Sequence, residues 1–208
     1  MTFIKICGIT SVEDAIAAVT SGANMLGFVF ADSPRRVRTG TVKHIQRVLA
    51  GDVKTVGVFT EESDEVQRIM DECDLTYAQL HGGQSEDFAR RLGASRVIRV
   101  ARVADESSID ALARHTEAAY YLLDTYRKDQ AGGTGETFDW SLAVRAKPLG
   151  KPIILSGGLT PKNVAEAVRA VEPFAVDVSS GVEASPGVKD HLKIKEFIDN
   201  VRKANSAA

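Results

Sequence analysis

The sequence predicts an α/β protein with a single domain, a (β/α)8 TIM barrel. Three observations lead to this fold. Eight short apolar runs occur along the chain, each is followed by a stretch with the residue spacing of a half-buried helix, and no linker divides the 208 residues. Eight units of roughly 26 residues fit the short end of the size range for this barrel.

The apolar runs are the predicted strands. In chain order they cover residues 3–7, 25–30, 54–59, 77–80, 96–100, 120–124, 152–156 and 174–178. Strands that alternate with helices are joined by right-handed crossovers and form a parallel sheet, and eight such units can close into a barrel. An open doubly wound sheet fits the same alternation and is the alternative fold.

The helical spacing is clearest in five of the intervening stretches. They cover residues 11–23, 64–74, 108–116, 160–171 and 190–203. We expect one domain over residues 1–208, with residues 204–208 as a frayed tail, because small polar residues at a chain end are rarely tied down.

The overall composition argues against several classes of protein. A net charge of -2 provides no basic stripe for nucleic acid, and no apolar stretch is long enough to span a membrane. The two cysteines, Cys7 and Cys73, lie far apart and in no disulfide or metal-binding spacing. The N-terminus has no apolar segment of the kind found in export signals, so we expect a cytoplasmic protein.

Polar residues stand where the predicted strands end. Ligands of such barrels meet the carboxyl ends of the strands, so these residues are candidates for one shared site. They are Cys7, Arg35, Arg36, Gln79, His81, Asp124, Ser156, Asp177 and Ser179.

Three glycine-bearing loops late in the chain indicate phosphate binding. They cover residues 132–138, 156–161 and 179–183, and the candidate residues are Gly133, Gly135, Ser156, Gly157, Gly158, Ser179, Ser180 and Gly181. Glycine lets backbone N–H groups approach an anion, and the loops after strands 7 and 8 are the recurrent phosphate site of these barrels. None of the loops matches a nucleotide-binding fingerprint.

Cys7 and Asp124 follow strands 1 and 6 and could face one another across a ligand. One could take a proton while the other gives one, and the positive ends of nearby helices could help to form a Cys7 thiolate. With phosphate anchoring, this suggests isomerisation of a small sugar phosphate. Other interpretations stay open: Cys7 as a core residue, His81 bonded to local backbone, and Asp177 bonded to a neighbouring loop rather than facing the ligand.

Six motifs in order resemble one known family. KICGIT, VGVF, QLHG, LLDT followed by GGTGETFDW, SGGLTPKNV and VDVSSGVE are similar to the phosphoribosylanthranilate isomerases of tryptophan biosynthesis, over residues 3 to about 200. That family carries out an Amadori rearrangement of N-(5-phosphoribosyl)anthranilate to 1-(2-carboxyphenylamino)-1-deoxyribulose 5-phosphate, with no cofactor or metal.

The resemblance implies roles for individual residues. Cys7 would be the general base, Asp124 the general acid and Arg36 the residue that holds the anthranilate carboxylate, although Arg35 beside it makes that register less defined. The phosphate would lie on the backbone amides of the three glycine loops. The partner would be the small-molecule substrate, and the chain a monomer or a homodimer.

Two rival functions remain. An isomerase of the histidine-pathway type would have aspartates at the ends of strands 1 and 5, where this chain has Cys7 and no acid. A non-catalytic barrel that binds a phosphate ligand would need neither Cys7 nor Asp124.

Overall fold

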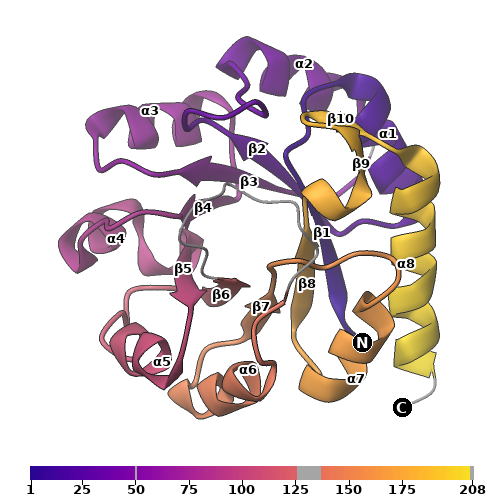
Figure 1. Ribbon diagram of the computed structural model, residues 1–208. Coiled ribbons are helices and arrows are strands. Elements are labelled where there is room, and N and C mark those ends of the chain that lie inside the picture. Colours follow the sequence, from indigo (N-terminus) through magenta and orange to yellow (C-terminus); the bar gives the residue numbers. More distant parts are fainter. Residues whose placement is uncertain (50, 126–136, 207–208) are drawn as a thin grey trace.

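The computed structural model describes residues 1–49, 51–125 and 137–206, and within them eight parallel strands close into one barrel (Figure 1). Each strand pairs with its neighbours in the sequence, and β8 pairs with β1 to complete the ring. The strands are β1 (Phe3–Cys7), β2 (Met25–Val29), β3 (Lys54–Phe59), β4 (Tyr77–Leu80), β5 (Val97–Val103), β6 (Tyr120–Thr125), β7 (Ile153–Leu155) and β8 (Ala175–Val178). The barrel is confirmed, and the open sheet is wrong.

An outer ring of helices covers the strands (Figure 1). They are α1 (Val12–Ser21), α2 (Thr39–Val48), α3 (Asp64–Glu72), α4 (Glu86–Leu92), α5 (Glu106–Leu112), α6 (Ser141–Ala146), α7 (Val164–Val171) and α8 (His191–Ser206). Local sequence sets their ends. The Ser11 side chain caps α1 by accepting from the Asp14 N–H at 3.1 Å, and Gly22 ends that helix with φ 111°.

The predicted frayed tail is wrong for residues 204–206. The last helix, α8, packs against α1 and α7 and continues to Ser206. Ala204 is buried in the core, and the Asn205 side chain accepts a hydrogen bond from the Thr2 N–H at 3.1 Å. The C-terminal turn is therefore held by contacts with the first residues of the chain, which the sequence pattern alone does not reveal.

Two other features differ from the sequence prediction. Strand β5 continues to Val103 because Arg102 and Val103 pair with Asp124 and Thr125 of β6. A small hairpin of β9 (Glu183–Ser185) and β10 (Val188–Lys189) follows the 3-10 turn η3 (Ser180–Val182) and was not predicted, since strands this short leave no apolar run.

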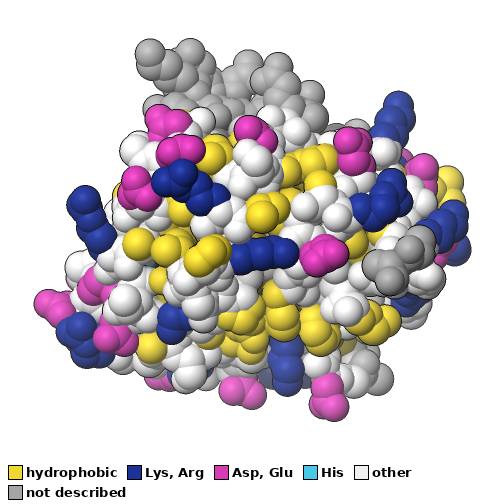
Figure 2. Space-filling model, turned by 90° about the horizontal axis from the view of Figure 1, so that it is seen from below, with side chains coloured by type: hydrophobic (Ala, Val, Ile, Leu, Met, Phe, Trp, Pro, Cys, Tyr) yellow, Lys and Arg dark blue, Asp and Glu magenta, His cyan; other side chains and the backbone are white. Residues whose placement is uncertain are grey.

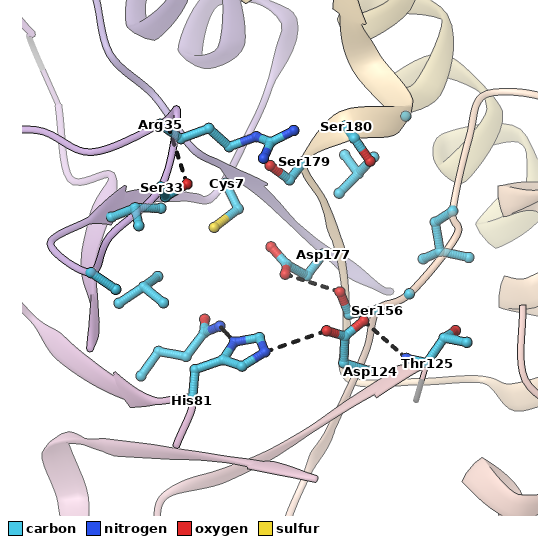
Figure 3. Close-up of a pocket in the computed structure, with 18 of the residues that line it drawn as sticks. Cys7, Ser33, Arg35, His81, Asp124, Thr125, Ser156, Asp177, Ser179 and Ser180 are labelled. Carbon is cyan, nitrogen blue, oxygen red and sulfur yellow. Dashed lines mark hydrogen bonds and ion pairs between the residues drawn. The ribbon is translucent and has the colours of Figure 1, made fainter. Parts of the chain in front are cut away.

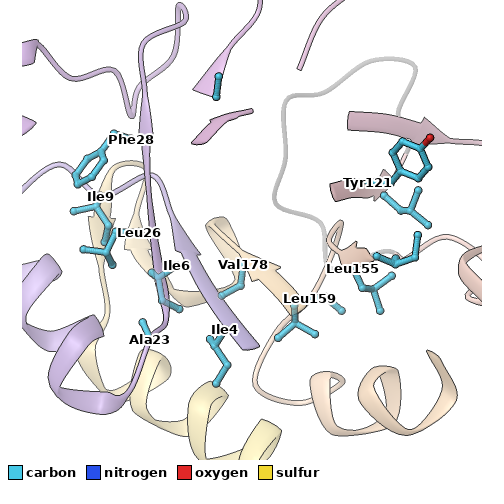
Figure 4. Packing of buried hydrophobic residues seen from close by; sticks show 14 of the residues in the cluster. Ile4, Ile6, Ile9, Ala23, Leu26, Phe28, Tyr121, Leu155, Leu159 and Val178 are labelled. Carbon is cyan, nitrogen blue, oxygen red and sulfur yellow. The ribbon is translucent and has the colours of Figure 1, made fainter. Parts of the chain in front are cut away.

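Side chains along each strand alternate between the helices and the barrel interior. Ile4 and Ile6 of β1 point outward into the apolar layer beneath the helices, together with Leu26, Leu155 and Val178 of other strands (Figure 4). Lys5 and Cys7 each follow one of these isoleucines in the sequence and therefore point inward. Because of this alternation, the side chains of these polar strand residues lie in the barrel interior.

The interior of the barrel is apolar at one end and polar at the other. Its lower layer contains Met25, Val56, Ile98, Leu122 and Ile154. At the N-terminal end of the strands the rings of Phe3, Tyr77, Tyr120 and Phe174 pack on one another with centroids 4.9 to 5.4 Å apart. Polar groups therefore concentrate near the carboxyl ends of the strands.

Basic and acidic side chains are interspersed on one outer face of the barrel. On the face shown in Figure 2, Lys and Arg side chains alternate with Asp and Glu, and no patch of one sign is present among the described residues. None of the described helices combines the length and apolar character that crossing a membrane requires.

Candidate active site

A cavity of about 450 Å³ opens at the carboxyl ends of the strands. This size is suited to a small organic ligand. Figure 3 shows that side chains from β1, β4, β6, β7 and β8 converge on it. Among its lining residues are Cys7, His81, Asp124, Ser156, Asp177 and Ser179, which the sequence predicted to share one face.

Cys7 forms one side of this cavity. It ends β1, is 7% exposed and packs against Val29 and Val58, while its sulfur faces the cavity (Figure 3). Cys7 is thus both a packed core residue and a cavity residue, and the two interpretations of the sequence are compatible.

A buried ion pair lies beside Cys7. Lys5 Nζ is 2.8 Å from Asp177 Oδ1, and the Ser156 hydroxyl donates to Asp177 Oδ2 at 3.1 Å. Lys5 is 0% exposed, so solvent does not reach the ion pair from the Lys5 side. Both oxygens of Asp177 are engaged within the protein, so its carboxylate binds neighbouring side chains.

A second charged cluster lies next to this pair. The Arg35 guanidinium donates to both carboxylate oxygens of Glu183 at 2.7 and 2.6 Å. Lys189 Nζ lies 3.0 Å from Glu183 Oε1 and donates to the Ser179 carbonyl at 3.0 Å. These contacts hold the β9–β10 hairpin against the end of β8 and close the Cys7 side of the cavity.

The charges around Cys7 act on its thiol. Burial raises the pKa of Cys7, the positive charge of Lys5 opposes this increase, and the Asp177 carboxylate adds to it. Lys189 also lowers the pKa of Cys7, by less than Lys5 does. The sequence pointed to helix N-termini as the source of positive potential, whereas the structure has two buried lysines in that place.

Asp124 forms another side of the cavity with His81. His81 Nε2 is 3.4 Å from Asp124 Oδ2, and the Thr125 N–H donates to Asp124 Oδ1 at 2.9 Å. The other ring nitrogen of His81, Nδ1, is 3.2 Å from Gln79 Nε2. The Asp124 side chain is 28% exposed, so this part of the cavity is more open than the Cys7 part.

The glycine loops border the same cavity. Of the predicted phosphate residues, the cavity lining includes Ser156, Gly157, Gly158, Ser179, Ser180 and Gly181. Gly157 has φ 82°, and a Cβ there would lie 2.3 Å from the Thr125 backbone nitrogen, so the loop can pass this close only with glycine. Gly133 and Gly135 lie outside the described residues.

The two neighbouring arginines after β2 are placed differently. Arg35 lines the cavity and is bound to Glu183, whereas Arg36 is exposed, is not part of the lining and has no ion pair among the described residues. Sequence reasoning missed Arg102, which also lines the cavity. Its signal was available, because Arg102 is two and four residues beyond the inward-facing Val100 and Ile98.

Comparisons with known proteins agree with this geometry. The family model described as "N-(5'phosphoribosyl)anthranilate (PRA) isomerase" matches residues 4–200. The N-(5'-phosphoribosyl)anthranilate isomerase of Geotalea uraniireducens is 48% identical over 204 residues, which are 97% of this chain and 99% of the relative.

Solved structures give the same picture. One is a phosphoribosyl anthranilate isomerase in complex with reduced 1-(o-carboxyphenylamino)-1-deoxyribulose 5-phosphate; it has a TM-score of 0.87 and 40% identity over 98% of this chain and 100% of that one. The other is a monomeric form generated from the dimeric enzyme of Thermotoga maritima, with a TM-score of 0.86, 40% identity and the same coverage.

Proposed function

This chain belongs to the N-(5'-phosphoribosyl)anthranilate isomerase family, and on that premise we propose that Cys7 is its general base and Asp124 its general acid. The enzyme converts N-(5'-phosphoribosyl)anthranilate to 1-(2-carboxyphenylamino)-1-deoxyribulose 5-phosphate in tryptophan biosynthesis. The observation that carries the proposal is that the thiol and the carboxyl group line one cavity from β1 and β6. That arrangement suits two proton transfers on one anchored sugar.

The chemistry follows in order. Asp124 gives a proton to the ring oxygen of the ribose, and the ring opens to a protonated Schiff base. The Cys7 thiolate then removes the proton from C2, and the resulting enolamine tautomerises to the ketone. Positioned acids and bases of this kind each contribute roughly 10²–10⁴ in rate.

His81 and Thr125 support the acid. The Thr125 N–H at 2.9 Å and the His81 ring at 3.4 Å hold the two oxygens of Asp124 in a fixed orientation at the cavity wall. We assign His81 to substrate binding as well, since it lines the same cavity next to Asp124. Both functions require that the His81 ring keep its present position.

Two anionic groups of the substrate orient C2 toward the thiol. The phosphate binds to the backbone of the loops that contain Ser156, Gly157, Gly158, Ser179, Ser180 and Gly181. Arg36 binds the anthranilate carboxylate, because the charge of Arg35 is already neutralised by Glu183. Binding energy from these two ends is thereby used for orientation at C2.

The two rivals are less compatible with the interior. Strand β5 presents Ile98, Val100 and Arg102 inward and β1 ends in Cys7, so neither of the two aspartates of a histidine-pathway enzyme is present. A purely phosphate-binding barrel has no use for Cys7 or for the His81–Asp124 pair.

The decisive experiment follows turnover of phosphoribosylanthranilate made in situ, through the loss of its fluorescence. Cys7→Ala and Asp124→Asn should each lower kcat by roughly 10²–10⁴-fold while the variants still bind a reduced product analogue. Cys73→Ala is the matched control for the thiol and should turn over like the wild type. Near wild-type turnover of Cys7→Ala or Asp124→Asn would remove that residue from its role.

The two anchoring groups are tested separately. An analogue that lacks the phosphate should bind at least tenfold more weakly, since each 1.4 kcal/mol of lost interaction corresponds to about tenfold in affinity. Arg36→Ala should raise the KM of the substrate and leave the affinity for an analogue without the carboxylate unchanged. If Arg35→Ala alone shows this pattern, Arg35 is the carboxylate ligand.

The remaining properties concern the protein in the cell. We propose a cytoplasmic location, because Cys7 and Cys73 are both free thiols. The chain is a monomer or a homodimer, and one of its structural relatives is dimeric. Sedimentation velocity distinguishes the two masses.

A further inference from the structure

Lys5 is a buried lysine that the proton transfers described above do not use. Its side chain is 0% exposed, and it lies inside the barrel, one inward-facing position before Cys7 on β1. A buried ammonium is expensive unless it is paired. Packing alone therefore does not account for a lysine next to the Cys7 thiol.

Asp177 accounts for the charge on Lys5. Lys5 and Asp177 are register partners on β1 and β8, and their polar atoms are 2.8 Å apart. The Ser156 hydroxyl donates to the other oxygen of Asp177 and fixes the carboxylate. Burial alone would lower the pKa of Lys5, but the Asp177 carboxylate and the Cys7 sulfur outweigh it and raise the pKa, so Lys5 stays a cation.

Gly27 brings the lysine and the thiol together. On β2 it is the register partner of Cys7, and a Cβ at Gly27 would lie 2.7 Å from Cys7 Sγ and 3.1 Å from Lys5 Nζ. Both atoms therefore lie against the same residue of β2. Any larger residue at this position would collide with both of them.

We propose that Lys5 is a positioning residue of the reaction, whose buried ammonium stabilises the thiolate form of Cys7. Asp177 holds this ammonium in place, and Gly27 leaves room for it because it has no side chain. This inference rests on the proposed role of Cys7 as the base. A thiolate in a closed, weakly polar setting is unfavourable without a nearby cation, and an opposite charge within roughly 4–6 Å favours the charged form. Lys5 supplies that cation without touching the substrate.

Other charged groups face the same thiol, and they define the competing contributions. They are Asp177 from β8, Lys189 from β10 and Arg35 from the loop after β2, while His81 and Asp124 line the cavity from the ends of β4 and β6. Glu183 forms direct ion pairs with both Arg35 and Lys189, so its single negative charge offsets one of their two positive charges. The Lys5 charge acts on the thiol more strongly than that of Asp177 or Lys189.

The test measures the titration of Cys7 directly. In a Cys73→Ala background, the rate of alkylation by iodoacetamide is followed from about pH 6 to about pH 11, since only the thiolate reacts. Lys5→Met should raise the apparent pKa of Cys7 by about one pH unit or more. Lys189→Met should raise it by less, and Lys195→Met, an exposed lysine of α8, should leave it unchanged.

Lys5→Met leaves the Asp177 carboxylate buried without its partner, which destabilises the fold. A second variant without this unpaired charge therefore accompanies it. Lys5→Met/Asp177→Asn removes both charges and should also raise the pKa of Cys7, because the contribution of Lys5 is the larger one. The acid limb of the kcat/KM profile, which reports the base of the free enzyme, should move in the same direction.

The outcomes separate this inference from the proposed function. If the alkylation pKa of Cys7 is the same in the wild type and in both Lys5 variants, Lys5 is only a structural ion pair and the inference is wrong. If Cys7→Ala keeps its turnover, the role of Cys7 as the base fails, while the alkylation profile still measures the effect of Lys5 on the thiol.

Discussion

The proposed general base, Cys7, and the proposed general acid, Asp124, stand in different environments within one cavity. Cys7 is 7% exposed and surrounded by the buried Lys5–Asp177 pair and by the cluster of Arg35, Glu183 and Lys189. Asp124 is 28% exposed and is held by a histidine ring and one backbone N–H. The Cys7 side is closed and built from opposed charges, whereas the Asp124 side is open.

This difference matches the chemistry required of each group. Thiols titrate above neutral pH and burial raises their pKa further, so a buried thiol base needs compensating cations. The proposed acid instead gives up a proton, so it needs orientation toward the ring oxygen and no compensating cation. Charge is therefore concentrated where the reaction needs it.

The Cys7 side and the Asp124 side of the cavity should differ most in the stability that is lost when one partner of an ion pair is removed. Asp177→Asn leaves the Lys5 ammonium buried with no counter-charge and should lower the free energy of unfolding by about 3–5 kcal/mol. His81→Ala removes a partner from a half-exposed pair and should cost less than about 1 kcal/mol, while still lowering kcat. Urea denaturation monitored by circular dichroism measures both.

A double variant sharpens the same comparison. Adding Lys5→Met to Asp177→Asn removes the unpaired charge and should restore most of the lost stability, because a neutral pair in the interior carries no desolvation penalty. If the double variant is as unstable as Asp177→Asn alone, the loss comes from packing and not from charge.

The close packing on the Cys7 side is tested at Gly27. Gly27→Ala places a Cβ 2.7 Å from Cys7 Sγ, so it should destabilise the protein by about 1–3 kcal/mol and lower turnover. Gly40→Ala, in α2 and with no atom within 4 Å of its new Cβ, is the matched control and should stabilise the protein slightly. Equal stability of the two variants would show that the atoms around Gly27 shift and make room for the new Cβ.

The smallest expected effect is a pH dependence on the Cys7 side. Burial alone would raise the pKa of Glu183, but the hydrogen bonds from Arg35 and the charge of Lys189 lower it below the usual 4.5. A lowered pKa in the folded state contributes stability above about pH 4.5, which is lost as the pH falls through the folded-state value. Glu183→Gln should thus be less stable than the wild type by about 1–2 kcal/mol at pH 7.

Thermal unfolding at several pH values checks this sign. The Tm difference between the wild type and Glu183→Gln should be greatest near neutral pH and should narrow below about pH 4.5. A Tm difference that stays constant from pH 7 to pH 3 would mean that the charge of Glu183 contributes nothing to stability.

Much of the fold and the site could be predicted from the sequence, because the signals are local. Apolar runs alternating with helical spacing gave the barrel, and the register of β1, β6, β7 and β8 placed Cys7, Asp124, Ser156 and Asp177 at one end. Arg102 escaped attention because a charged residue at the end of an apolar run is usually solvated. The folded tail at Ala204 escaped it because its partners lie near residue 2.

The sequence by itself determined which residues stand at the carboxyl ends of the strands and on which face, since strand alternation and chain order are local properties. Only the tertiary structure decided that Lys5 pairs with Asp177, that Lys5 approaches Cys7 beside Gly27, and that Glu183 pairs with Arg35. These pairings join residues up to 172 positions apart, and they form only when barrel closure brings β1 beside β8.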